Sequence, residues 1–253
     1  MKTDEVIMEL VLLTAFGVGG ATVFGAVMGF IFKGITNKFS NAVLSFSAGI
    51  MLAAAILGLI LPSLEYGGRH ALLISVIGIL VGAGVMKSLD LVVPHIHTPG
   101  AEHGEDGRAE KIMLFILAIA IHNLPEGIAA GVGFGTGDTG NALLIALGIA
   151  LQNIPEGMVI IAPMLSVGIP AKRTFLLASA TGFIEVVGAL LGYFAVSFAS
   201  AILPFALSFA GGTMLYVISD DIIPEVHSDG KHGFSTVAMI IGFCLMLIMS
   251  VVL

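Results

Sequence analysis

Long stretches of this chain contain no charged residue, and this feature restricts its fold more than any other. The cleanest stretches are Leu10–Phe32, Phe39–Leu64 and Gly233–Leu253. Each has about 20 residues or more, enough for a helix rising about 1.5 Å per residue to cross a hydrocarbon layer of about 30 Å. Because 57% of the 253 residues are hydrophobic and only 11% are charged, we predict an all-α integral membrane protein.

Charges, glycine clusters and prolines divide the chain into eight predicted transmembrane helices, which form a single domain over residues 1–253. The break between the sixth and seventh helices rests on Pro204. The longest connection, 94–110, contains His95 and His97 among acidic residues, and we predict a mobile cytoplasmic loop there. The predicted spans are residues 6–32, 39–64, 71–93, 111–135, 141–167, 173–199, 204–226 and 233–253.

The positive charges predict the orientation of the chain in the membrane. Eight of the ten Lys and Arg residues fall on one side of the alternating spans, and only Lys2 and Arg69 fall on the other. The positive-inside rule therefore places both termini outside the cytoplasm, in the cell (plasma) membrane. The net charge of −7 gives no support to a nucleic-acid partner, and the single cysteine, Cys244, excludes an intramolecular disulfide.

A motif of the form Asn-x-Pro-Glu-Gly occurs twice, near the middle of the fourth and fifth predicted spans. A glutamate at this depth in a bilayer costs roughly 2.5–3.5 kcal/mol. Two such insertions at matching depth indicate one functional site built from two helices. The candidate ligands are His122, Asn123, Glu126, Gln152, Asn153 and Glu156.

The spacing and chemistry of these residues favour a metal ion. His122 and Glu126 are four residues apart and share one helix face, and Gln152 and Glu156 repeat that spacing. Imidazole, amide and carboxylate groups together suit a divalent transition metal, zinc in particular. Two glutamates also neutralise one dication, which removes the main energetic objection to placing it in lipid.

A proline follows the candidate ligands in each motif copy. Pro125 and Pro155 cannot donate hydrogen bonds to the carbonyls of Ile121 and Leu151. We therefore expect each helix to open where the ligands lie, with the freed carbonyl oxygens facing a cavity.

Further polar residues lie within or near the apolar spans. Glu185, near mid-depth of the sixth span, either completes the site as a third carboxylate or makes a hydrogen bond between helices. Asp220 and Asp221 form either an exit-side metal relay or a solvated helix end. His95 and His97 would hold metal only transiently.

These paired motifs on the fourth and fifth of eight helices resemble the ZIP (Zrt/Irt-like) family of divalent metal transporters, particularly its prokaryotic GufA-like branch. The resemblance implies uptake of zinc, and often iron, manganese or cadmium, into the cytoplasm, with the metal as transported substrate. It also implies that helices 1–3 and 6–8 are inverted repeats flanking helices 4 and 5. Inverted repeats around a midplane site suggest elevator-like alternating access.

The resemblance also implies two adjacent metal sites that share Glu126 and Glu156. The first would add His122 and Gln152. The second would add Asn123, Asn153 and Glu185. Many family members have histidine in place of Gln152, and some have aspartate in place of Asn153, so we expect weaker zinc preference and a weaker second site here.

Two other functions are alternatives to transport. An intramembrane metal-dependent enzyme would need a general base and an open coordination position, but the chain has no His-Glu-x-x-His motif. A metal-binding sensor would need a cytoplasmic output domain. We therefore predict a transporter and not an enzyme, while the physiological metal, proton or anion coupling, carrier or channel behaviour and homodimerisation stay open.

Overall fold

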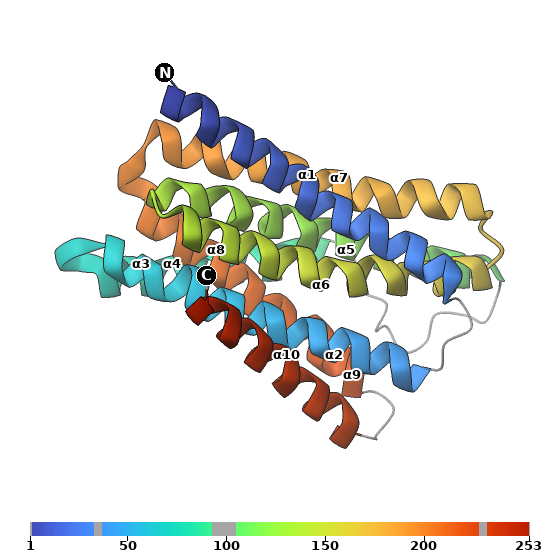
Figure 1. Cartoon of the computed structure of the whole chain (residues 1–253). Coiled ribbons are helices and arrows are strands. Elements are labelled where there is room, and N and C mark those ends of the chain that lie inside the picture. Colours follow the sequence, from blue (N-terminus) through green and yellow to red (C-terminus); the bar gives the residue numbers. More distant parts are fainter. Residues whose placement is uncertain (1, 33–36, 93–104, 228–231, 253) are drawn as a thin grey trace.

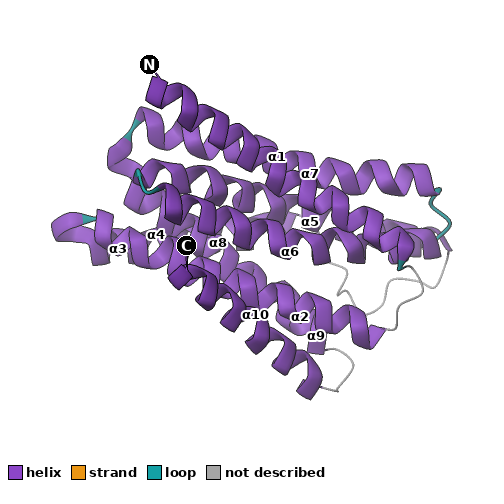
Figure 2. Ribbon diagram, viewed as in Figure 1, coloured by secondary structure: helices purple, strands orange, loops and turns teal. Residues whose placement is uncertain are grey.

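The computed structural model describes residues 2–32, 37–92, 105–227 and 232–252. This part of the chain is helical, without a strand among the described residues (Figure 2). The segments are α1 (Lys2–Ile31), α2 (Asn37–Ala53), η1 (Ala54–Ile60), α3 (Leu61–Tyr66), η2 (Gly68–His70), α4 (Ala71–Val92), α5 (Glu105–Gly133), η3 (Phe134–Thr136), α6 (Thr139–Ser166), α7 (Ala171–Phe198), η4 (Ser200–Ile202), α8 (Leu203–Val217), η5 (Ile218–Ile222), α9 (Ile223–His227) and α10 (His232–Val252).

The long helices have the size and surface of a membrane protein. Seven helical stretches in the described chain are long and apolar enough to cross a membrane, and α5 is a further long helix. Large apolar side chains such as Leu72, Leu80 and Phe198 are exposed on their outer faces. Water-soluble monomers rarely expose so much apolar surface. The prediction of an all-α, multi-pass membrane protein is confirmed.

The helices pack as two bundles. The first bundle contains α1, α5, α6 and α7, with its closest contacts between α1 and α6 and between α5 and α7 (Figure 1). The second bundle contains α4, α10 and two continuous rods, α2–η1–α3 and α8–η5–α9. Its closest contacts join α2 to α10 and α4 to α8.

Glycines set the helix separation inside each bundle. A Cβ atom on Gly127 of α5 would overlap the backbone oxygen of Glu185 on α7, and one on Gly157 of α6 would overlap that of Thr22 on α1. Only glycine allows backbones to approach this closely. Equivalent backbone contacts occur in the second bundle at Gly49, Gly82, Gly212 and Gly242.

The same pattern of helix–helix contacts is obtained when α1, α2 and α4 are exchanged with α7, α8 and α10, and α5 with α6. The pair α5–α7 then becomes α6–α1, and the pair α4–α8 becomes α10–α2. The contact of Gly127 with Glu185 likewise becomes the contact of Gly157 with Thr22. This exchange is the pattern of the predicted inverted repeat, with α5 and α6 at its centre.

The two long rods of the second bundle are interrupted in the same way. In each, a π-helical segment, η1 or η5, is followed by a short α-helix whose second residue is proline, Pro62 or Pro224. Proline removes one α-helical hydrogen bond, so the carbonyl four residues earlier needs another partner. The carbonyl of Gly58 has one in the Asn141 side chain, at 3.4 Å.

Two expectations about α5 and α6 differ from the structure. Pro125 and Pro155 lie inside uninterrupted α-helices, so the helices do not open at the candidate ligands as expected. A proline costs one hydrogen bond, and the turns on either side preserve the helix; the departures from α-helical bonding lie in η1 and η5 instead. In addition, α5 begins at Glu105, inside the predicted 94–110 loop, because acidic residues there favour a helix N-terminus.

Candidate metal centre

The two copies of the motif meet in the interior of the protein, where α5 packs against α6. Five of the six predicted ligands are buried, and Glu156 is half-buried with its Oε1 atom fully covered. The tight contacts of Gly127 with α7 and of Gly157 with α1 fix the depth of both motif copies. Sequence spacing and glycine packing therefore bring the two polar sets to one place in an apolar bundle.

Most polar atoms of these six side chains have no hydrogen-bond partner. A buried polar atom left without a partner costs about 1–3 kcal/mol, and native proteins contain few of them. Their concentration here indicates a binding site for a ligand. The atoms are His122 Nε2, Asn123 Oδ1, Glu126 Oε1 and Oε2, Gln152 Oε1 and Nε2, Asn153 Oδ1 and Glu156 Oε1.

The charges of this set are close enough to interact. Glu126 interacts electrostatically with Glu156 and Glu185, and Glu156 interacts with His122. Among the described residues, however, no three His, Cys, Asp or Glu side chains alone converge as a metal-binding group. The side-chain oxygens of Asn123, Gln152 and Asn153 are therefore needed to complete a coordination shell.

His122 also faces Asp221, which lies on η5 in the second bundle. Its Nε2 atom is 3.1 Å from Asp221 Oδ2, yet neither atom has a partner with hydrogen-bond geometry. Two atoms bound at about 2.0–2.1 Å to one tetrahedral zinc ion are about 3.3–3.4 Å apart. The pair is therefore spaced almost as two ligands of one ion would be, and it joins the two bundles.

Glu185 has a different set of neighbours from the other carboxylates. Its Oε1 atom accepts hydrogen bonds from Thr22 Oγ1 at 2.7 Å and from Asn123 Nδ2 at 2.5 Å. Its Oε2 atom accepts one from Asn153 Nδ2. Of the two interpretations of Glu185 that the sequence leaves open, this geometry matches the hydrogen bond between helices.

The remaining predicted residues lie farther from this centre. Asp220 is exposed and accepts a hydrogen bond from the hydroxyl of Tyr216 at 3.1 Å, so only its neighbour Asp221 reaches His122. His95 and His97 lie outside the described residues, and their predicted role in transient metal binding stays a prediction.

Two residues at the centre were not predicted from the sequence. Thr22 reaches Glu185 from α1, and Ser47 of α2 donates a hydrogen bond to the backbone oxygen of Gln152 at 3.1 Å. Both are buried hydroxyls in apolar helices. Such residues usually bond to their own helix backbone, so nothing local in the sequence distinguishes these two.

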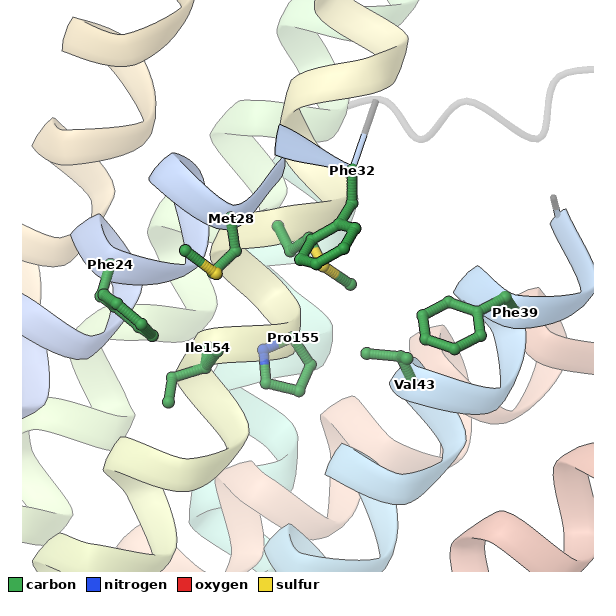
Figure 3. Close-up of a pocket in the computed structure, with 8 residues that line it drawn as sticks. Phe24, Met28, Phe32, Phe39, Val43, Ile154 and Pro155 are labelled. Carbon is green, nitrogen blue, oxygen red and sulfur yellow. The ribbon is translucent and has the colours of Figure 1, made fainter. Parts of the chain in front are cut away.

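An apolar cavity of about 300 Å³, open to the outside of the protein, lies between the two bundles at Pro155. Phe39 and Val43 of α2 face Ile154 and Pro155 of α6 across it (Figure 3). Its other walls are Phe24 and Met28 of α1, Phe32 directly after α1, and Met158 of α6. The two bundles are therefore packed less closely against each other at this place than the helices are packed inside each bundle.

Comparison with known proteins gives a family for this arrangement. The model of the ZIP zinc transporters matches residues 90–250, which include both motif copies, Glu185 and Asp221. The chain belongs to the ZIP zinc transporter family. The resemblance predicted from the paired motifs is thus confirmed.

Curated ZIP relatives match along nearly the whole chain. Zinc transporter ZIPB of Bordetella bronchiseptica is 37% identical, over 92% of this chain and 78% of that protein. Zinc transporter GufA of Myxococcus xanthus is 35% identical, over 94% and 96%. Zinc transporter ZIP11 of Homo sapiens is 31% identical, over 95% and 96%. These ZIP proteins are named as transporters, so the prediction that the chain is not an enzyme is confirmed.

Proposed function

We propose that this protein carries divalent transition-metal ions, zinc foremost and then iron, manganese or cadmium, into the cytoplasm of the cell. The ion binds on α5 and α6, between Glu126 and Glu156. The protein lies in the plasma membrane with both termini outside. The observation that carries this proposal is the group of unpartnered, buried nitrogen and oxygen atoms on these two helices.

The donor chemistry supports a transition-metal dication as the transported substrate. The imidazole of His122 is a ligand for zinc and not for calcium or magnesium, which prefer oxygen. The carboxylates of Glu126 and Glu156 together neutralise a charge of +2. An ion between them would also give partners to atoms that otherwise each cost about 1–3 kcal/mol in the interior.

Elevator-like movement of the first bundle against the second is supported by the difference in packing within and between them. Inside the bundles, glycines lock helix backbones together. Between them lie the apolar cavity beside Pro155 and polar contacts that include His122 with Asp221, Ser47 with Gln152 and Asn141 with Gly58. The first bundle contains the six motif residues, so a rigid shift of it would carry the bound ion.

Asp221 is the first step of the exit path in this proposal. It is half-buried and faces His122 on one side, and the exposed Asp220 lies next to it. An ion released from Glu126 and Glu156 would pass to His122 and Asp221 and then to water. The basic residues Lys172 and Arg173, in the first turn of α7, mark the cytoplasmic end of the helices.

Zinc uptake into proteoliposomes tests the proposed function. We expect saturable uptake by the unmodified protein and its loss in Glu156→Ala, with uptake retained in the matched control Glu65→Ala. Glu65 is an exposed carboxylate at the end of α3, away from the motif. Uptake by Glu156→Ala equal to that of the unmodified protein would show that the ion does not use this site, and flux that never saturates would indicate a channel.

The same vesicles rank the metals. Uptake of iron, manganese and cadmium at equal concentration, with zinc as competitor, gives the order of preference. We expect zinc to suppress the uptake of the other three. Failure of zinc to compete would contradict zinc as the preferred substrate.

A further inference from the structure

The hydrogen bonds of Glu185 determine which way two neighbouring amide groups face. A carboxylate only accepts hydrogen bonds, so Asn123 and Asn153 must each turn the NH₂ group of the side chain toward Glu185. Asn153 Nδ2 is held further by the backbone oxygen of Val18, at 3.2 Å. The carbonyl oxygens of both asparagines therefore face away from Glu185.

The helix spacing places both asparagines beside the carboxylates of the candidate metal centre. Asn123 lies three residues before Glu126, and Asn153 three residues before Glu156, so each pair shares a helix face. Both asparagines are fully buried, and the Oδ1 atom of each has no partner. An amide turned the other way would present a donor to a cation and repel it.

Thr22 holds Glu185 in place. Its hydroxyl donates to the same Oε1 atom that accepts from Asn123, and both Thr22 and Glu185 are fully buried. The two residues occupy exchanged positions in the inverted repeat, because Gly157 contacts the backbone of Thr22 as Gly127 contacts that of Glu185. One half of the repeat thus supplies the carboxylate and the other half supplies a hydroxyl donor to it.

We propose that Glu185, fixed by Thr22, is a positioning residue that aims the carbonyl oxygens of Asn123 and Asn153 at the transported ion. The chain consequently binds one ion in this centre. The inference rests on the proposed function and replaces the second metal site expected from the family resemblance, in which Glu185 is itself a ligand.

The argument for a single ion is one of charge and hydrogen bonding. Glu126 and Glu156 neutralise one dication. The carboxylate of Glu185 is instead stabilised by hydrogen bonds from Thr22 and the two asparagine amides. A second ion on Glu185 would displace these donors and leave them buried without partners, which is costly. An aspartate in place of Asn153 would remove one donor and add a charge, which creates the conditions for a second ion.

Zinc binding to the purified, detergent-solubilised protein tests the proposal, with equilibrium dialysis giving ions per chain and the dissociation constant. We expect one ion per chain. Thr22→Val should keep that stoichiometry but weaken binding roughly tenfold, since removing a group that orients metal ligands typically costs about 10–100-fold. Thr22→Ser keeps the hydroxyl and should restore the affinity to within about twofold.

Thr213→Val is the matched control. Thr213 is as fully buried as Thr22, but its hydroxyl donates to Ala210 of its own helix in the second bundle. Unchanged affinity is expected for Thr213→Val. Equal affinities for Thr22→Val and the unmodified protein, or two ions bound by the unmodified protein, would overturn the proposal.

Asn153→Asp provides an independent test if Thr22→Val fails to fold. We expect it to bind two zinc ions per chain, and a single ion would overturn the argument that the amides exclude the second. Failure of the proposed function gives a different result, because the unmodified protein would then bind no zinc in dialysis and transport none in vesicles.

Discussion

Replacing Gly188 by alanine tests whether the close approach of α5 and α7 maintains the geometry of the candidate metal centre. A Cβ atom at this position would lie 2.5 Å from the backbone oxygen of Leu124, with Ile128 N at 3.0 Å and Gly127 Cα at 3.1 Å. All three are backbone atoms, so no side chain can rotate away. To reach an ordinary contact of 3.4 Å, the two helices must separate by about 0.9 Å.

This separation acts directly on the hydrogen bond between Asn123 and Glu185. Glu185 lies three residues before Gly188 on α7, and its Oε1 atom is 2.5 Å from Asn123 Nδ2. A parting of about 0.9 Å would lengthen this contact to about 3.4 Å, beyond the usual limit of about 3.2 Å for such a bond. We expect the free energy of unfolding to fall by about 1–3 kcal/mol and zinc affinity to fall roughly tenfold.

Thermal unfolding and equilibrium dialysis on the same purified samples measure both effects. The matched control is Gly20→Ala on α1, where an added Cβ would meet no atom within 4 Å. Its stability should stay the same or rise slightly, because alanine favours helix more than glycine does. If Gly188→Ala and Gly20→Ala behaved alike in both measurements, the account of glycine packing around the site would be wrong.

Three further substitutions test separate parts of the proposal. Gln152→His adds an imidazole to the site and should raise zinc affinity in dialysis by roughly tenfold or more; unchanged or weaker binding would show that Gln152 is not a ligand. Asp221→Asn removes one charge from the exit path, so maximal zinc flux should fall several-fold while affinity changes little; equal flux would remove Asp221 from the path. Val43→Trp fills the cavity beside Pro155 and should slow transport without changing zinc stoichiometry, and normal transport would argue against movement at that interface.

The sequence predicts the membrane fold and the family well because these depend on local patterns. Uncharged stretches of about 20 residues indicate membrane helices without any knowledge of their neighbours. The paired motif likewise predicts its ligands from short sequence spacings, such as that between His122 and Glu126. Both the uncharged stretches and the motif spacings can be recognised within a single helix, without knowing which helices are its neighbours.

The contacts that define the centre depend on which helices become neighbours, and the sequence does not show this. Thr22 and Glu185 are 163 residues apart, and neither has a local feature that indicates the other. The hydrogen bonds of Glu185 could therefore not be predicted from the sequence. Asp221 reaches His122 from η5 in the other bundle, and a proline such as Pro224 does not by itself predict a π-helix.

If transport proceeds by the proposed elevator-like movement, the inverted repeat has a consequence for its energetics. If its two halves were identical in sequence, the states open to either side of the membrane would be equal in free energy, and the empty protein would populate both equally. Residues that differ between the halves, such as Thr22 against Glu185, break this balance. Each 1.4 kcal/mol of difference shifts the ratio of the two states about tenfold. Under the proposed elevator-like mechanism, the unlike residues at exchanged positions would therefore set the resting orientation of the empty protein.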